Sequence, residues 1–227
     1  YISKLKIQIS QGLLYFQRKA AQVAFFCGGT FSHLNTVMHY CFHHIPKTGG
    51  SSLRMRLEDR ADKKQISKLD YAVGHNTTVR TPGTHFVWLR DPLDRDISHY
   101  NYDMGKGDID SDNFEDHCKK LSGNFMILWL YKNYLCKDAN EKIEVKYDTV
   151  RGCLQNTFNR VYTLKNFESS WDDICDALKL DREPRLNTNR SDADYQKYIS
   201  RQELDQEFID WHQQHNSFDY MLYKEFS

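Results

Sequence analysis

The stretch MHYCFHHIPKTGGSSLRMR, residues 38 to 56, decides the fold. Tyr40 lies among β-favouring neighbours, so residues 38 to 44 predict a short buried strand. Pro46 ends that strand because a proline cannot donate to the hydrogen-bond ladder. Two glycines follow, and the residues from Leu53 onward have the pattern of a helix. Strand, glycine turn and helix N-terminus together predict an anion-binding loop, since free N–H groups and the helix dipole favour phosphate-like charge.

The position of the lysine distinguishes this loop from the usual nucleotide loops. A Walker A loop carries its lysine after the glycines, whereas Lys47 precedes Gly49 and Gly50. The segment HIPKTGGSS, residues 44 to 52, instead resembles the 5′-phosphosulfate loop of sulfotransferases that use 3′-phosphoadenosine 5′-phosphosulfate (PAPS). Within that family, it is most similar to the branch of carbohydrate O-sulfotransferases. The alternative interpretation is a structural glycine turn with a surface lysine.

A second motif follows the predicted strand 84 to 90. Asp91 is a suitable N-cap and Pro92 a suitable first residue for the next helix. The segment LRDPLDRDISHY, residues 89 to 100, resembles the 3′-phosphate signature of the same sulfotransferases. The alternative here is a capping ion pair of Arg90 with Asp91. Two short motifs that each follow a predicted strand are more specific together than either one is alone.

The resemblance implies roles for individual residues. Lys47 would stabilise charge on the leaving phosphate, and His75 would be the general base, because Val-Gly-His-Asn resembles a segment with the catalytic histidine in some carbohydrate sulfotransferases. His75 also follows a short predicted strand, where ligands of open α/β sheets bind. Other candidates for the base are His99, His44 and His43. Residues implied to bind the cofactor PAPS are Lys47, Thr48, Gly49, Gly50, Ser51, Ser52, Arg90 and Ser98, with Arg95 at a further basic position.

The 227 residues suit one α/β domain, a P-loop-like parallel sheet flanked by helices, because predicted strands alternate with helices. Residues 2 to 26 have the periodicity of an amphipathic helix, which Gly28-Gly29 would end, and residues 1–37 lie outside the resemblance. They are expected to form an arm that packs on a domain of residues 38–227, or that binds a membrane surface or a partner.

Later elements are predicted from periodicity and from capping signals. Helices are expected from Pro92 through Tyr102, over 113–121, 125–135 and 149–158, and from a cap near Ser169 or Ser170. A polar loop is expected over 105–110, and a strand over 160–165. The capping box Ser200-Arg201-Gln202-Glu203 is expected to open a last long helix. A loop at 184–191 resembles one that closes over the nucleotide in the family.

The composition limits the kinds of partner that the sequence predicts. Lys plus Arg (31) equals Asp plus Glu (31), so no basic field points to nucleic acid as a partner. The six cysteines lack the spacing of a zinc site, and no metal is predicted. No apolar run is long enough to span a membrane. A cytoplasmic location is expected, with the Golgi lumen as the alternative if an anchor precedes Tyr1.

The expected activity is transfer of a sulfuryl group from PAPS to a hydroxyl acceptor, with a glycan as the acceptor that the resemblance implies. A P-loop kinase-like enzyme is the alternative within enzymes, and it would need Mg²⁺ and a carboxylate such as Asp91. The alternative outside enzymes is a nucleotide-binding module without turnover.

Overall fold

A computed structural model describes residues 39–68, 70–74, 83–109, 113–135, 142–181 and 198–227. The predicted arm at 1–37, His75 and the loop at 184–191 lie outside the described residues. No helix in the described part of the chain is long and apolar enough to cross a membrane.

The described residues contain a sheet of parallel strands, as the alternation of strands and helices predicts. Its strands are β1 (Tyr40–His43), β2 (Tyr71–Gly74), β3 (Thr84–Leu89) and β4 (Arg160–Thr163), in the order β2-β1-β3-β4. The chain passes from β1 to β2 on one side, and β3 lies on the other side of β1. The loops after β1 and β3 therefore flank a topological switch point, where ligands of open α/β sheets bind.

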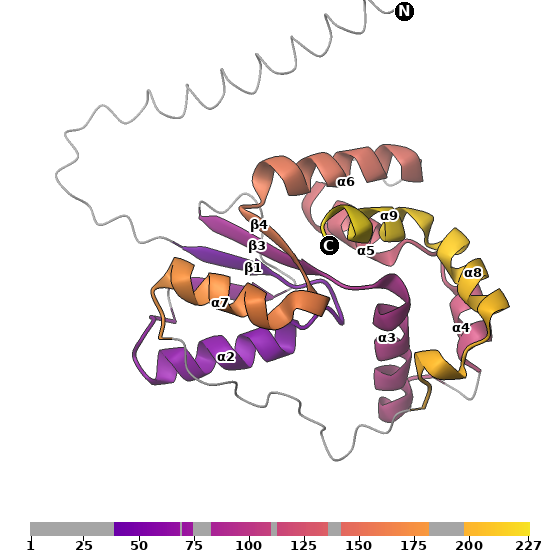
Figure 1. The fold of residues 1–227 in the computed structure, drawn as a ribbon, viewed down its shortest axis with the longest axis horizontal. Helices are drawn as coiled ribbons and strands as arrows, with labels where there is room; N and C mark the ends of the chain where they lie inside the picture. Colours follow the sequence, from indigo (N-terminus) through magenta and orange to yellow (C-terminus); the bar gives the residue numbers. More distant parts are fainter. Residues whose placement is uncertain (1–38, 69, 75–82, 110–112, 136–141, 182–197) are drawn as a thin grey trace, which may run out of the picture. The chain divides into compact units, whose positions relative to one another are not determined.

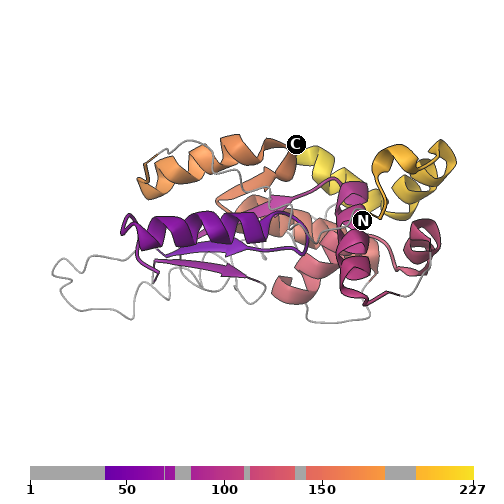
Figure 2. The same ribbon diagram turned by 90° about the horizontal axis from the view of Figure 1, so that it is seen from below.

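Two helices cover one face of the sheet (Figures 1 and 2), namely α2 (Gly50–Asp62) and α7 (Phe167–Leu178). The aromatic side chains of β1 and β3 on this face are buried against leucine and isoleucine of the helices: Phe42, Phe86, Trp88, Leu53, Leu57 and Ile174. Arg56 of α2 donates to both carboxylate oxygens of Glu168 of α7, at 3.1 and 2.7 Å. This bidentate pair fixes the two helices to each other.

The opposite face is covered by α5 (Phe125–Leu130), α6 (Ile143–Thr157) and α9 (Ser217–Glu225), as Figure 1 shows. A π-helical turn at Tyr131–Leu135 continues α5. The buried apolar side chains between these helices and the sheet include Ile45, Val87, Leu89, Met126, Ile127, Leu154 and Leu222.

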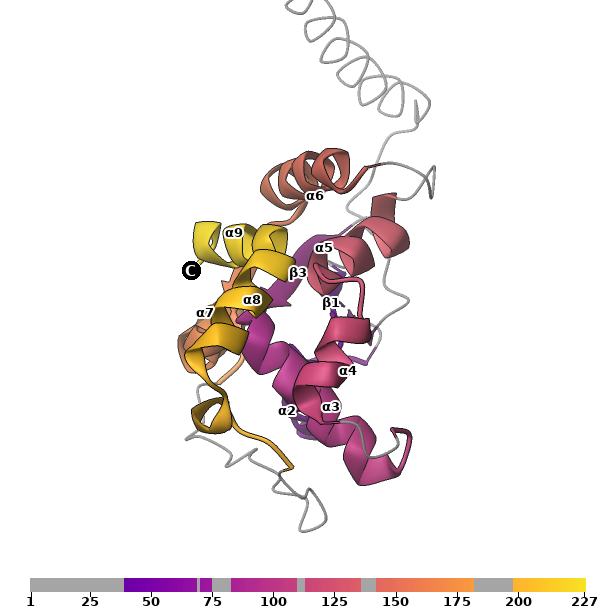
Figure 3. The ribbon, with the colours of Figure 1, turned by 90° about the vertical axis from the view of Figure 1, so that its right-hand side faces the viewer.

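A third cluster lies beyond the carboxyl end of β3. It joins α3 (Pro92–Lys106), α4 (Phe114–Lys120) and α8 (Gln206–His215), which lie together in Figure 3. The predicted cap of α3 is confirmed, since the Asp91 carboxylate accepts from the N–H of Asp94 at 3.1 Å and Pro92 is the first helical residue. The helix that starts directly after β3 is therefore held firmly at its N-terminus.

Several predicted boundaries are wrong. Helix α3 continues to Lys106 and ends at Gly107, which has a left-handed φ of 72°, so the expected loop does not begin at Gly105. Helix α6 begins at Ile143, six residues before the predicted 149. Helix α7 begins at Phe167, because the hydroxyls of Ser169 and Ser170 donate back to the carbonyl of Asn166 instead of capping the helix.

The last predicted helix is broken into shorter pieces. The capping box at Ser200 and Glu203 is confirmed, but it opens only a 3₁₀ turn at Arg201–Glu203. Asp205 then caps α8 with a side-chain bond to the N–H of Phe208, and Asn216 separates α8 from α9. The predicted strand over 160–165 is likewise shorter, because a 3₁₀ turn at Leu164–Asn166 follows β4.

A buried histidine pair makes the fold sensitive to acid. His43 is 1% exposed, its Nε2 lies 2.9 Å from His85 Nδ1, and burial, aided by the charge of His85, lowers the pKa of His43 to about 3. The folded pKa lies below the unfolded value of roughly 6.5, so this stability is present above pH 6.5 and is lost as the pH falls toward 3. We expect the free energy of unfolding to fall more between pH 7 and pH 5 in the wild type than in His43→Gln, when both are measured by urea denaturation. Equal losses in the two proteins would show that His43 does not titrate in this way.

Candidate active site at the ends of β1 and β3

The loop after β1 turns sharply into α2. The Thr48 hydroxyl donates to the carbonyl of Ile45 at 2.9 Å, and Gly49 takes a left-handed φ of 92°. A Cβ on Gly50 would lie 2.1 Å from the His44 ring, so only glycine fits there. The loop thus brings the main chain of α2 close to the end of β1. The main-chain N–H of Thr48 also donates to the carbonyl of Ile45, at 3.3 Å, so both donors of Thr48 are used to shape the loop.

The first turn of α2 offers unpaired main-chain donors. The first i to i−4 bond of this 13-residue helix runs from the N–H of Leu53 to the carbonyl of Gly49, at 3.1 Å. The N–H groups of Gly50, Ser51 and Ser52 therefore have no acceptor within the helix. Together with the helix dipole they form an anion-binding surface directly after the loop.

Lys47 has an unusual main-chain conformation in this loop. Its φ is 68°, in the left-handed region that few non-glycine residues adopt. Its ammonium lies 4.0 Å from the centroid of the Tyr102 ring of α3. Burial, followed by the charge of Arg90, lowers the pKa of Lys47. Strain of this kind is concentrated at functional sites in proteins.

Arg90 connects the two sequence motifs. It follows β3 directly, and its Nη1 donates to the carbonyl of Lys47 at 2.9 Å. The loop after β1 and the segment after β3 are therefore in direct contact at the switch point of the sheet. The rule that carboxyl ends of parallel strands lie at one edge predicts this proximity.

Ser98 and Arg95 occupy different environments on α3. Ser98 is half-buried, two turns from the start of the helix. The Arg95 guanidinium is buried, pairs with Asp96 and lies 3.8 Å from the centroid of the Phe125 ring. Its pKa is lowered to about 10, chiefly by burial. Arg95 therefore contributes to the packing of α3 against α5, in addition to adding positive charge behind Arg90.

No family model, curated protein or solved structure matches the chain. Any function must therefore be argued from the residues and the geometry of the site.

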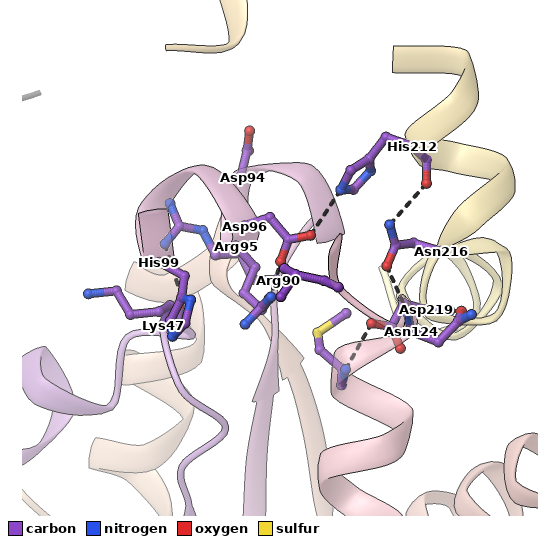
Figure 4. Close-up of polar contacts among 12 residues, drawn as sticks. Lys47, Arg90, Asp94, Arg95, Asp96, His99, Asn124, His212, Asn216 and Asp219 are labelled. Atoms are coloured by element: carbon purple, nitrogen blue, oxygen red, sulfur yellow. Dashed lines mark hydrogen bonds and ion pairs between the residues drawn. The ribbon is translucent and has the colours of Figure 1, made fainter. Parts of the chain in front are cut away.

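Behind the site, a buried polar network joins α3 to the C-terminal helices (Figure 4). His212 Nε2 lies 2.9 Å from Asp96. His212 Nδ1 lies 3.2 Å from the Tyr220 hydroxyl. Because a carboxylate only accepts, Nε2 of His212 carries the hydrogen, and Nδ1 accepts from Tyr220 when the ring is neutral. Burial lowers the pKa of His212 to about 4, so the ring is neutral at pH 7. The network fixes α3 from the side opposite the loop.

One group of side chains in the described residues has the composition of a metal site. Ligand atoms of Asp96, Cys118 and His212 lie within 4.8 Å of one another. However, the Asp96 oxygens are already bonded to Arg95 and His212, and burial raises the pKa of Cys118 to about 12, which keeps the thiol protonated. These residues fit a hydrogen-bond network better than a metal centre, because the neighbouring guanidinium already neutralises the carboxylate.

Three residues near Lys47 were not identified as a group from the sequence. These residues are Tyr102, His99 and Asp103. The Lys47 ammonium lies over the Tyr102 ring, and His99 Nδ1 lies 3.3 Å from Asp103, one turn farther along α3. The spacing of His99 and Asp103, four residues apart on a predicted helix, was the available signal. The predicted base His75 directly follows β2 in the sequence and lies outside the described residues.

Proposed function

We propose that the protein is a PAPS-dependent O-sulfotransferase that transfers a sulfuryl group to a hydroxyl, with carbohydrate as the expected acceptor. The observation that carries the proposal is the contact of Arg90 with the carbonyl of Lys47, 2.9 Å long. It brings the segment similar to a 5′-phosphosulfate loop against the segment similar to a 3′-phosphate signature. A donor with phosphates at both positions needs these two segments together.

The donor would bind across this contact. Its 5′-phosphate would accept hydrogen bonds from the first turn of α2, through Gly50, Ser51 and Ser52, with Thr48 and Gly49 shaping the loop. Its 3′-phosphate would bind Arg90 and Ser98, because guanidinium groups pair well with phosphate oxygens. Arg90 would then exchange or share its present bond to the Lys47 carbonyl.

Lys47 would act on the reaction itself. In sulfuryl transfer the acceptor oxygen forms a bond to sulfur while the bond from sulfur to the phosphate oxygen breaks, and its electron pair leaves with adenosine 3′,5′-bisphosphate. The Lys47 ammonium would move from the Tyr102 ring to that oxygen and stabilise the developing charge, as in phosphoryl transfer. The pKa of Lys47 is lowered chiefly by its partial burial. At a partly buried site, the attraction between the ammonium and the developing negative charge is stronger than in water.

A direct experiment tests the proposed reaction. The protein is incubated with PAPS and a panel of unsulfated heparosan and chondroitin oligosaccharides, phenols and small alcohols, and the products are examined by mass spectrometry. We expect one acceptor class to gain an SO₃ group, with no loss of rate when EDTA is added. A reaction that EDTA abolishes and Mg²⁺ restores would indicate a kinase-like enzyme. Binding of nucleotide with no transfer to any acceptor would indicate a module without turnover.

A further inference from the structure

A histidine and a carboxylate on α3 lie beside the Lys47 ammonium. His99 and Asp103 are four residues apart on the same side of the helix, and His99 Nδ1 lies 3.3 Å from Asp103 Oδ2. The carboxylate can only accept a hydrogen bond, so Nδ1 carries the hydrogen and the lone pair is on Nε2. Among the described residues, Nε2 has no hydrogen-bond partner. The pair thus holds a neutral imidazole in the tautomer that can accept a proton.

His99 and Asp103 lie next to residues that the proposed sulfuryl transfer uses. His99 directly follows Ser98, the expected ligand of the 3′-phosphate, and Asp103 directly follows Tyr102, whose ring holds the Lys47 ammonium. The charge of Lys47 acts on both His99 and Asp103. The two side chains remain partly accessible, at 34% for His99 and 20% for Asp103. Figure 4 shows His99 and Lys47 in the same region, between α3 and the loop after β1.

We propose that His99, oriented by Asp103, accepts the proton of the acceptor hydroxyl. This inference rests on the proposed sulfotransferase function. The acceptor oxygen forms its bond to sulfur, its proton passes to Nε2 of His99, and the electron pair of the broken sulfur–oxygen bond leaves with the bisphosphate. His99 then releases the proton to water. His99 is thus a catalytic residue and Asp103 a positioning residue.

The charges around His99 suit a base. Burial chiefly lowers the pKa of His99, and Arg95 of the same helix, Lys47 of the loop and His117 of α4 lower it further, whereas Asp103 raises it. From α5 the ring faces Phe125, with 6.3 Å between centroids. The imidazole is therefore neutral at pH 7, as proton transfer requires. Removing Asp103 should lower the pKa of His99, because the remaining neighbours are positive or apolar.

The test compares three variants with the wild type, using PAPS and the acceptor from the panel that gains sulfur. His99→Asn should lower kcat by about 10²–10⁴, the usual contribution of acid–base catalysis, and remove the acid limb of the kcat/KM profile. Asp103→Asn should retain part of the activity and move that limb to lower pH. The affinity of both variants for adenosine 3′,5′-bisphosphate should stay within about threefold of the wild type, since neither group binds the donor.

The third variant, His75→Asn, addresses the base that the sequence predicted. If His99→Asn keeps its turnover and its acid limb while His75→Asn loses both, His99 is not the base and the sulfotransferase function stands. An unshifted limb in Asp103→Asn would contradict the orienting role of Asp103. If the wild type transfers sulfur to no acceptor of the panel, this inference and the proposed function both fail, and that outcome is recognised before any variant is made.

Discussion

Replacing Lys47 with alanine should lower kcat for sulfuryl transfer by about 10²–10³, the cost of removing one group that stabilises developing charge. The affinity for adenosine 3′,5′-bisphosphate should change far less, because the interaction strengthens as the sulfur–oxygen bond breaks. Pre-steady-state or single-turnover kinetics with PAPS give the first quantity, and titration calorimetry gives the second.

A neighbouring lysine provides the matched control for this variant. The Lys106 ammonium lies 4.1 Å from the same Tyr102 ring, but Lys106 is at the end of α3 and exposed. Lys106→Ala should therefore keep nearly normal turnover. If Lys47→Ala turns over as fast as Lys106→Ala, the catalytic role of Lys47 is wrong. This holds whether both variants keep their turnover or both lose it equally, since an equal loss would reflect the positive charge near Tyr102 and not a specific role of Lys47.

Asp219 is expected to have the largest effect on stability. It is 1% exposed, and its carboxylate accepts from the N–H groups of Met126 and Ile127 at 2.8 and 2.9 Å, so it caps α5 from α9. Asp219→Ala would leave two buried donors without acceptors, and we expect a loss of about 2–4 kcal/mol in the free energy of unfolding, measured by urea denaturation.

A surface aspartate serves as the comparison. Asp210 of α8 is exposed and accepts a hydrogen bond from Gln206, at 2.7 Å, so Asp210→Ala should change the free energy of unfolding by less than about 0.5 kcal/mol. Similar losses in Asp219→Ala and Asp210→Ala would contradict the capping role. Burial also raises the pKa of Asp219 to about 6. The stability linked to this group is therefore present at low pH and is lost as the pH rises through 6, a dependence that Asp219→Asn should remove.

Local signals in the sequence were sufficient for the elements around the site. The proline after β1, the two glycines of the loop, and Asp91 with Pro92 at the start of α3 each restrict the main chain at one place. The order of strand, loop and helix was therefore predicted correctly, although α2 begins at Gly50 and not at Leu53. The end of α3 was missed because Gly105 and Gly107 are equally plausible terminators in the sequence. Only Gly107 takes the left-handed conformation that ends the helix.

Contacts between distant residues could not be predicted in the same way. The contact of Lys47 with Arg90 follows from the general rule for parallel sheets, but Asp96 and His212 are 116 residues apart and meet only because α8 packs against α3. The burial of Arg95 has the same origin, since its guanidinium is covered by Phe125 of α5. Such contacts depend on how helices pack, which periodicity does not determine.

Recognition of the 3′-phosphate distinguishes a PAPS enzyme from other nucleotide-binding proteins, and calorimetry measures it without an acceptor. The wild type should bind adenosine 3′,5′-bisphosphate at least about 100-fold more tightly than AMP, because bonds between charged groups contribute about 1.5–3 kcal/mol each. Arg90→Ala should remove most of that difference, and Ser98→Ala a smaller part. Equal affinity of the wild type for the two nucleotides, or an unchanged preference in Arg90→Ala, would contradict the proposed donor site.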